Sequence, residues 1–261
     1  MRASSTILTV DRGNTFTKVM AFRGTEVVER STFSNSDSLD GFGRLGSLNP
    51  QGAIVTFSGR RDGKLLTAFK EICGGGKVME LNHDMRLPVD ISVYHNRALG
   101  LDRLAALAGA AVSMPETPVL IIDLGTAVTY DFLTADRVYR GGNIAPGMSM
   151  RFKSLHDFTA NLPEVSPEGE VSLWGFDTET AIRNGVVQGM VFEIAQYLGV
   201  VAEKSGSFKT LLTGGDAPYF MKVLKEDNFL PIKLHENRNL VFMPDLVGRG
   251  LLEIYNLNEN N

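Results

Sequence analysis

The sequence predicts an α/β protein built from two related lobes. Three observations predict it: a strand–turn–strand pattern that occurs twice, helical periodicity between and after the two copies, and a length of 261 residues. That length is sufficient for two small domains, each with a hydrophobic core. This prediction rests mainly on the two copies of the strand–turn–strand pattern.

The first copy lies near the N-terminus. Residues 7–10 form an apolar strand, Asp11-Arg12-Gly13-Asn14-Thr15 follows, and a second strand covers residues 17–22. A third short strand is expected over residues 26–31. Two apolar runs joined by a tight glycine-containing turn indicate a hairpin.

The second copy lies just past the middle of the chain. An apolar strand over residues 119–122 leads into Asp123-Leu124-Gly125-Thr126, then into a strand over residues 128–133. A third strand is expected around residues 137–141. Because three strands recur in the same order around Asp-x-Gly, we interpret the copies as two related lobes.

A helix with apolar residues at helical spacing is expected over residues 98–113. Residues 114–118, Met-Pro-Glu-Thr-Pro, end it, because proline stops a helix and stiffens a linker. The predicted domains are therefore residues 1–115 and 116–261.

The second lobe continues with a loop over residues 141–147 and an exposed polar stretch over 161–169. A long helix over residues 178–204 places five apolar side chains on one stripe: Ile182, Val186, Met190, Ile194 and Leu198. We interpret the stripe as core, with a dimer face as the alternative. The chain then runs through a strand at 211–213 into Gly214-Gly215 and two helices, 217–225 and 245–255.

Composition limits the class of protein. Hydrophobic residues make up 43% of the chain and charged residues 21%, which is typical of a globular protein. The net charge of −4 argues against a general nucleic-acid binder. With Cys73 as the single cysteine there is no intrachain disulfide. No signal peptide and no apolar run of membrane-spanning length are recognised, so we expect a soluble, cytoplasmic protein.

The two Asp-x-Gly turns are the first candidate site. Glycine at a turn lets the backbone approach a ligand and adopt dihedral angles that other residues avoid. Asn14, Thr15 and Thr126 add donors suited to a polyphosphate, and the carboxylates of Asp11 and Asp123 are suited to a cation. Either copy alone is explained as well by an ordinary Asp-capped turn. Their repetition favours a phosphate clamp.

Gly100-Leu101-Asp102-Arg103 at the start of the helix is the second candidate site. A charged first turn explains this pair by itself. In a kinase, Asp102 would accept the proton of the attacking hydroxyl, and Arg103 would bind an acidic acceptor or the transferring phosphoryl group. The methionines and Trp174 are interpreted as packing residues.

Taken together, these motifs resemble the type III pantothenate kinases, and the resemblance covers nearly the whole chain. Each motif is weak alone, but six in the family's order are specific. Arg97 is a departure, because the family usually has proline after Asn96. The shared motifs are Asp11-x-Gly13-Asn14-Thr15 with Lys18, Gly100-x-Asp102-Arg103, Asp123-x-Gly125-Thr126-Ala127, Gly142-x-Ile144-x-Pro146-Gly147, Thr178-x-x-Ala181 and Thr213-Gly214-Gly215.

The resemblance implies two ribonuclease-H-like lobes of the actin-like ATPase fold, with ATP in the cleft between them, and phosphorylation of pantothenate in coenzyme A biosynthesis. It implies a homodimer that completes the acceptor pocket, magnesium with ATP, and potassium or ammonium bound by Asp123. Asp102 would be the general base. The implied ATP contacts are Asp11, Arg12, Gly13, Asn14, Thr15, Phe16, Thr17, Lys18 and Thr126. The implied pantothenate contacts are Tyr94, Gly100, Leu101, Asp102, Arg103 and Thr178.

Three alternatives remain open at this point. The first is a kinase of another small acceptor on the same fold, such as a sugar or acetate. The second is an actin-like or chaperone-like ATPase, whose attacking group is water and which would have no use for Gly-x-Asp-Arg. The third is a catalytically silent regulator, against which the presence of Asp11, Asp102 and Asp123 argues.

Overall fold

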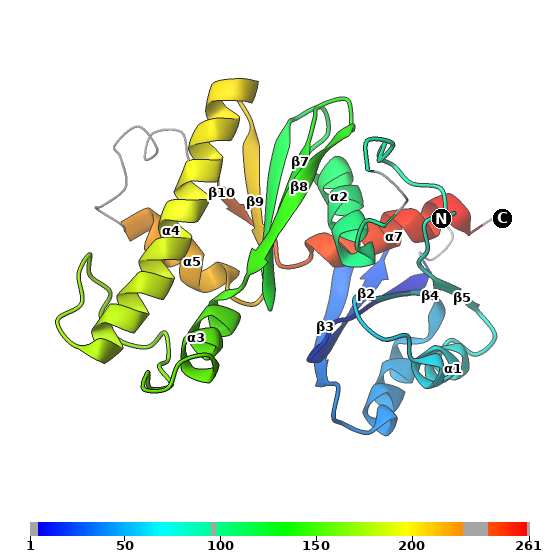
Figure 1. Cartoon of the computed structure of the whole chain (residues 1–261). Coiled ribbons are helices and arrows are strands. Elements are labelled where there is room, and N and C mark those ends of the chain that lie inside the picture. Colours follow the sequence, from blue (N-terminus) through cyan, green and yellow to red (C-terminus); the bar gives the residue numbers. More distant parts are fainter. Residues whose placement is uncertain (1–4, 95–97, 227–239, 260–261) are drawn as a thin grey trace. The chain divides into compact units, whose positions relative to one another are not determined.

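The computed structural model describes residues 5–94, 98–226 and 240–259 (Figure 1). Arg97, the departure from the family pattern, lies outside this described part. The chain forms two compact units. The first comprises residues 1–116, 136–139 and 245–261, and the second comprises residues 117–135 and 140–244. The main division thus falls next to the predicted boundary, but the last helix belongs to the first unit.

The first unit is built on a five-stranded sheet with the order β3-β2-β1-β4-β5. β1 pairs antiparallel with β2 and parallel with β4, and β4 pairs parallel with β5. The three strands of the first predicted copy are confirmed. The strands are β1 (Thr6–Arg12), β2 (Phe16–Arg23), β3 (Glu26–Ser34), β4 (Pro50–Phe57) and β5 (Lys77–Glu80).

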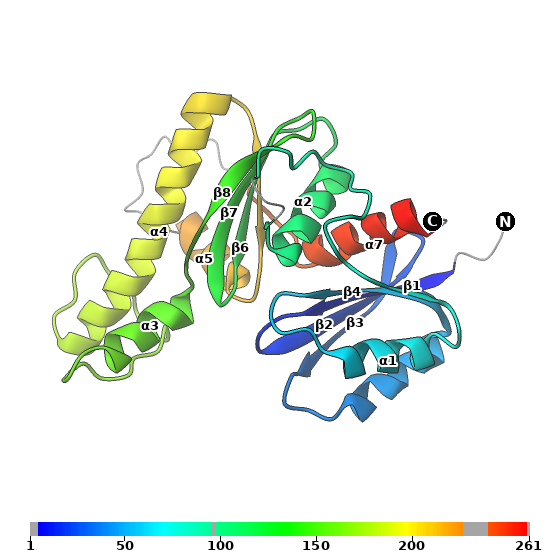
Figure 2. The same ribbon diagram turned by 45° about the vertical axis from the view of Figure 1, so that its right-hand side comes forward.

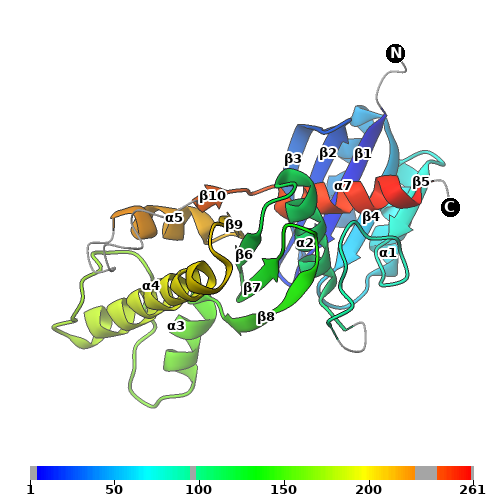
Figure 3. The same cartoon turned by 90° about the horizontal axis from the view of Figure 1, so that it is seen from above.

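Helices cover both faces of this sheet. Leu8 and Val10 of β1 point to one face and pack with the 3₁₀ helix η1 (Leu39–Leu48) and α1 (Gly63–Ile72). Since side chains alternate along a strand, Thr9 points to the other face. There it lies close to Gly248 of α7 (Leu246–Asn258), the helix that crosses the sheet in Figure 3.

Close backbone contact between α7 and α2 (Leu101–Ser113) explains why the C-terminal helix belongs to the first unit. A methyl group at Gly250 would overlap the carbonyl oxygen of Ala105, and one at Gly109 would overlap that of Leu246. Glycine at both positions lets the two helices approach without intervening side chains. The predicted lobe 116–261 and the observed second unit therefore differ in this helix.

The second unit repeats the sheet topology of the first. Its strand order is β10-β9-β6-β7-β8, with β6 antiparallel to β7 and parallel to β9, and β9 parallel to β10. Read from β8, this is the same order as β3-β2-β1-β4-β5, so the predicted internal repeat is confirmed. The strands are β6 (Val119–Leu124), β7 (Ala127–Leu133), β8 (Tyr139–Pro146), β9 (Lys209–Thr213) and β10 (Leu240–Phe242).

The loop predicted over residues 141–147 is wrong, because most of it belongs to β8. Gly141, Gly142 and Pro146 make this segment resemble a turn in composition. Pairing of β8 with β7 overrides that local preference. Gly141 still has a φ of 104°, a value that favours glycine.

Three helices, α3 (Met148–Asp157), α4 (Thr178–Ser205) and α5 (Ala217–Glu226), pack on the second sheet (Figures 1 and 2). All five residues of the predicted stripe on α4 are buried in this core, which confirms the core interpretation. Val187 and Val191 are buried as well. These positions are therefore unavailable to a partner subunit.

Two other expectations about the second unit are wrong. No apolar run of membrane-spanning length was expected, but α4 is long and apolar enough to cross a membrane. Its buried apolar side chains are typical of a core helix in a globular protein. Trp174, predicted to pack, is 72% exposed. It lies just before α4, two residues from the exposed Phe176.

Candidate functional site

The first Asp-x-Gly turn joins β1 to β2. Asp11 ends β1 opposite Lys18 of β2 and Thr56 of β4, so the strand pairing fixes its position. The N–H of Gly13 donates to the carbonyl oxygen of Phe16 (3.0 Å), which closes the turn. Asn14 and Thr15 at its tip are exposed. The turn therefore presents the exposed side chains of Asn14 and Thr15 to solvent.

Asn35, at the end of β3, holds this turn in shape. Its Nδ2 donates to the Gly13 carbonyl (2.8 Å), its backbone N–H donates to the Thr15 carbonyl (2.9 Å), and its Oδ1 accepts from the Thr17 hydroxyl (2.8 Å). Sequence reasoning missed this residue. A single asparagine 22 positions from Gly13 gives no pattern that would have identified it.

Two of the predicted ATP contacts belong to the same network. Nη1 of Arg12 donates to the Thr17 hydroxyl (2.7 Å), and Nη2 lies 3.6 Å from Oδ2 of Asp62. Thr17 is fully buried. In this structure both side chains support the turn from behind, whereas Asn14, Thr15, Phe16 and Lys18 are exposed.

The expectation that the turn glycines adopt unusual dihedral angles is wrong. Neither Gly13 nor Gly125 has a positive φ. A methyl group on Gly13 would lie 3.3 Å from the Phe16 carbonyl oxygen, and one on Gly125 would meet nothing closer than 3.6 Å. A side chain would therefore make a tight contact at Gly13 but only ordinary contacts at Gly125.

Four of the predicted acceptor residues, Gly100, Leu101, Asp102 and Arg103, lie at the N-terminus of α2. Gly100 precedes the helix and provides no side-chain cap. Oδ1 of Asp102 accepts from the backbone N–H of Arg103 (2.8 Å), which fixes the carboxylate in the first turn. No hydrogen bond to its Oδ2 is found within the described part of the chain. The half-buried carboxylate therefore has an oxygen that can take a proton from a hydroxyl group.

Arg103 is 5% exposed and lies against two tyrosines. Its Nη2 donates to the hydroxyl of Tyr139 (2.9 Å), and its guanidinium carbon lies 5.8 Å from the centre of the Tyr94 ring. The two rings are 5.9 Å apart. The structure thus brings together Tyr94 and Arg103, two of the expected acceptor contacts, and adds Tyr139. Tyr139 was missed because it comes 36 residues after Arg103.

A β-bridge between Asp90 and Val138 places Tyr94 beside Tyr139. The backbone N–H of Asp90 donates to Arg137, and that of Tyr139 donates back to Asp90. The side chain of Asp90 accepts from the N–H of Ser92 (2.8 Å). This hydrogen bond lowers the pKa of the Asp90 carboxyl.

The second Asp-x-Gly turn joins β6 to β7. The half-buried Asp123 lies opposite Thr129 of β7 and Thr213 of β9, and Thr126 is exposed at the tip. The N–H of Gly125 donates to the Ala127 carbonyl (3.1 Å), and that of Gly147 donates to the Thr126 carbonyl (3.0 Å). Each predicted residue of this turn is therefore at the same end of the second sheet.

Two glycines pack directly against this turn. A methyl group at Gly147 would overlap the carbonyl oxygens of Gly125 and Thr126. Gly214, with a φ of 95°, lies beside the Leu124 carbonyl, and a methyl group there would be 2.5 Å from Oδ1 of Asp123. The N–H of Asp216 donates to the same Leu124 carbonyl (2.9 Å). Burial raises the pKa of Asp216.

Thr178 is the first residue of α4, where Asp177 and Thr180 form a capping box. Together with Arg151 of α3 it lines a groove of about 640 Å³ between α3 and α4. Three aromatic side chains that directly follow α3 or precede α4 in the sequence are exposed: Phe158 (87%), Trp174 (72%) and Phe176 (93%). Thr178 thus lies in the second unit, on a surface that is rich in apolar side chains.

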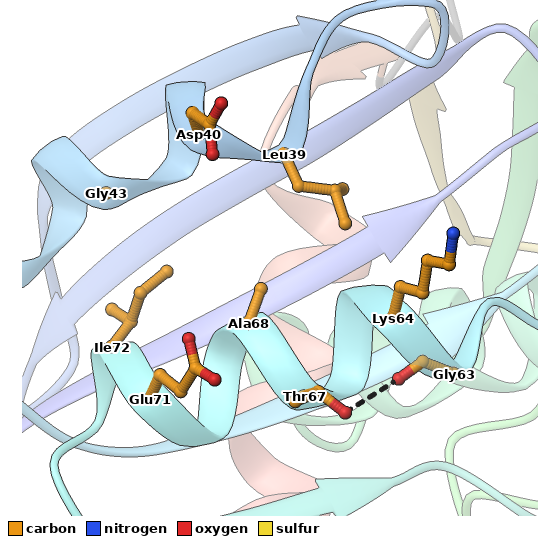
Figure 4. Close-up of a pocket in the computed structure, with 9 residues that line it drawn as sticks. All are labelled: Leu39, Asp40, Gly43, Gly63, Lys64, Thr67, Ala68, Glu71 and Ile72. Atoms are coloured by element: carbon orange, nitrogen blue, oxygen red, sulfur yellow. Dashed lines mark hydrogen bonds between the residues drawn. The ribbon is translucent and has the colours of Figure 1, made fainter.

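A second groove, of about 600 Å³, lies between η1 and α1 (Figure 4). Leu39, Ala68 and Ile72 line it together with Asp40, Lys64 and Glu71. It includes none of the predicted site residues. Cys73 is also unsuited to catalysis, because burial raises the pKa of its thiol to about 11.

Two mixed sheets with the same strand order, each with an acidic glycine turn, are the architecture of the actin-like ATPase and sugar-kinase fold. A glucokinase from an Antarctic psychrotroph superposes with a TM-score of 0.51 at 12% identity, over 97% of this chain and 99% of the glucokinase. This likeness concerns the fold alone.

The sequence comparisons define the family. The model of the type III pantothenate kinase family matches residues 7–199. A type III pantothenate kinase from Phocaeicola vulgatus is 40% identical over 235 residues, covering 87% of this chain and 94% of the relative. One from Porphyromonas gingivalis is 34% identical over 254 residues, covering 96% and 98%. The chain belongs to the type III pantothenate kinase family.

Proposed function

We propose that this protein transfers the terminal phosphoryl group of ATP to pantothenate, giving 4′-phosphopantothenate, the first step of coenzyme A biosynthesis. The observation that carries the proposal is the group at the start of α2, where the Asp102 carboxylate lies next to the buried Arg103 between Tyr94 and Tyr139. A carboxylate base and a guanidinium on adjacent residues suit an acceptor with a hydroxyl and a carboxylate, whereas hydrolysis needs no such pair.

The residues have separate roles in this reaction. Asn14, Thr15 and Lys18 of the first turn, and Thr126 of the second, bind the phosphates of ATP together with nearby backbone amides. Asp102 takes the proton of the pantothenate hydroxyl as its oxygen attacks the phosphorus. Phosphoryl transfer depends mainly on positioning and charge neutralisation, so these groups are sufficient parts. Magnesium accompanies ATP and neutralises part of its charge.

We further propose that Asp123 binds a potassium or ammonium ion. Its half-buried carboxylate ends β6 beside Gly214, and the space next to Oδ1 is one that a side chain at position 214 would fill. Oxygen donors of this kind suit a hard cation. The ion would offset negative charge near the phosphates. Equal activity in potassium and sodium salts would contradict this assignment.

The active species is proposed to be a homodimer in the cytoplasm. Support comes from the apolar surface around Thr178, where Phe158, Trp174 and Phe176 are exposed. Large exposed aromatic side chains at the adjoining ends of two helices are typical of an interface. In the dimer, Thr178 would contact the pantothenate bound by the neighbouring subunit. A fully active monomer in sedimentation at assay concentration would contradict this arrangement.

The function is tested by measuring ADP release with ATP, magnesium and potassium in the presence of pantothenate, glucose, acetate or no acceptor. We expect turnover only with pantothenate. Turnover without acceptor would favour the ATPase alternative, and turnover with glucose or acetate another kinase. Asp102→Asn should lower kcat by about two orders of magnitude while ATP binding stays within a factor of about two.

A further inference from the structure

The loop that follows β4, Ser58-Gly59-Arg60-Arg61, lies beside the first turn. β4 pairs in parallel with β1, and Phe57 at its end is opposite Arg12. The carboxyl ends of both strands therefore lie at the same edge of the sheet. The backbone N–H of Ser58 donates to the Arg12 carbonyl (3.0 Å), so the loop begins in direct contact with the turn.

Gly59 brings this loop against the exposed tip of the turn. A methyl group at position 59 would lie 2.8 Å from Oδ1 of Asn14, closer than side-chain carbons normally approach. One residue after Arg61, Asp62 forms the ion pair with Arg12 and caps α1. The loop is thus fixed at both ends to the elements that shape the turn.

The two arginines of the loop differ in their partners. Nε and Nη2 of Arg61 donate to both carboxylate oxygens of Glu80 at 2.7–2.9 Å. Arg60 is exposed, and within the described residues it makes no hydrogen bond or ion pair. Arg60 follows Gly59 directly, so its side chain leaves the backbone one residue from the contact with Asn14.

The second unit has a loop at the equivalent place. β9 pairs in parallel with β6, as β4 does with β1, and is followed by Gly214-Gly215-Asp216. Gly214 lies against Asp123 and Leu124, and Asp216 donates its N–H to Leu124. In both units, therefore, a glycine loop after the fourth strand of the repeat contacts the Asp-x-Gly turn. The loop in the first unit differs by carrying Arg60.

We propose that Arg60 binds the phosphates of the nucleotide held by the first turn. The proposal rests on the proposed use of ATP and adds a residue to its binding site. Guanidinium groups bind phosphate oxygens with paired hydrogen bonds and stay charged at all working pH values. Arg60 exchanges no proton in the reaction: the bond between phosphorus and the bridging oxygen breaks, the bond to the acceptor oxygen forms, and Arg60 offsets charge on the remaining oxygens.

The test measures binding of the non-hydrolysable analogue AMPPNP with magnesium, and binding of AMP, by calorimetry to the full chain. Arg60→Ala should weaken AMPPNP binding at least about tenfold and AMP binding less than about twofold, and Arg60→Lys should recover part of the loss. Arg61→Ala is the matched control, because it removes the same charge one residue away. It should leave both affinities within about twofold.

Equal effects of Arg60→Ala and Arg61→Ala on AMPPNP, or an equal loss for AMP, would overturn the proposal. A wild-type protein that failed to bind AMPPNP would overturn it together with the use of ATP. If the wild type binds AMPPNP but does not phosphorylate pantothenate, the proposed acceptor is wrong while the role of Arg60 stands. Because Arg60 is exposed, we expect both variants to fold, and their melting temperatures check this.

Discussion

The two Asp-x-Gly turns occupy the same place in the repeated sheet but are held by different means. Side chains hold the first turn in shape: Asn35, Arg12 and Thr17 form a hydrogen-bonded network behind Gly13 and Thr15. Around the second turn, backbone packs on backbone, with Gly147 against Gly125 and Thr126, and Gly214 against Leu124. One turn is supported by polar side chains and the other by close packing.

The difference shows that a repeat can keep its topology while its local supports change. A polar network loses its hydrogen bonds one at a time, and each costs about 1 kcal/mol. At a backbone contact that admits only glycine, every side chain must displace the main chain, so even the smallest substitution has a large cost in stability. The first turn should therefore respond gradually to mutation and the second abruptly.

The largest effect is expected for Gly147→Ala. The added methyl group would overlap two carbonyl oxygens of the second turn, and backbone atoms cannot move aside as a flexible side chain can. We expect the free energy of unfolding to fall by about 3 kcal/mol or more, measured by urea denaturation. Gly189→Ala is the control: it lies in α4 with open space around it and should be neutral or stabilising.

A smaller effect is expected for Asn35→Ala. It removes the hydrogen bonds that the Asn35 side chain makes to Gly13 and Thr17, so the turn loses its preferred shape without a steric clash. We expect the KM for ATP to rise about tenfold, the KM for pantothenate to stay unchanged, and stability to fall by about 1–2 kcal/mol.

Ser36→Ala, at the exposed neighbouring position, provides the control and should leave the KM for ATP unchanged. Asn35→Asp separates the two hydrogen bonds, since it keeps an acceptor for Thr17 and removes the donor to Gly13. If Asn35→Ala affected stability alone and left both KM values unchanged, the network would be structural only.

The smallest effect on stability is expected for Gly125→Ala. Its nearest neighbours would be at 3.6 Å and its φ is not positive, so we expect a change in unfolding free energy below about 0.5 kcal/mol. The methyl group would nevertheless occupy the space through which phosphate approaches the amides, and ATP affinity should fall at least about tenfold. A stable variant with normal ATP affinity would show that the second turn does not contact the nucleotide.

Much of this architecture could be predicted from the sequence where periodicity is strong. The hairpins of both copies, α2 and the long α4 were predicted because their apolar residues recur at strand or helix spacing. The segment with η1, β4, α1 and β5 was left undefined, since glycines at 41, 43, 46 and 52 interrupt its pattern. The prediction of a loop over residues 141–147 was wrong because the pairing of β8 with β7 outweighs local composition.

The site was predicted to the extent that its residues are close together in the sequence. The turns and Gly100-Leu101-Asp102-Arg103 are short motifs. Asn35 and Tyr139 act on residues 22 and 36 positions away, through contacts that only the folded chain creates. The interior role of Thr17 was missed because alternation along β2 places its side chain inside, whereas the motif suggested a ligand contact.

The central proposal is that each Asp-x-Gly turn contacts the phosphates of bound ATP. Hydrogen–deuterium exchange of the full chain with and without magnesium-AMPPNP tests it most directly, because it reports on individual backbone segments. We predict slower exchange in residues 12–18 and also in residues 124–128, whose amides lie at the two turns. Slower exchange in only one of these segments at saturating AMPPNP would contradict the claim.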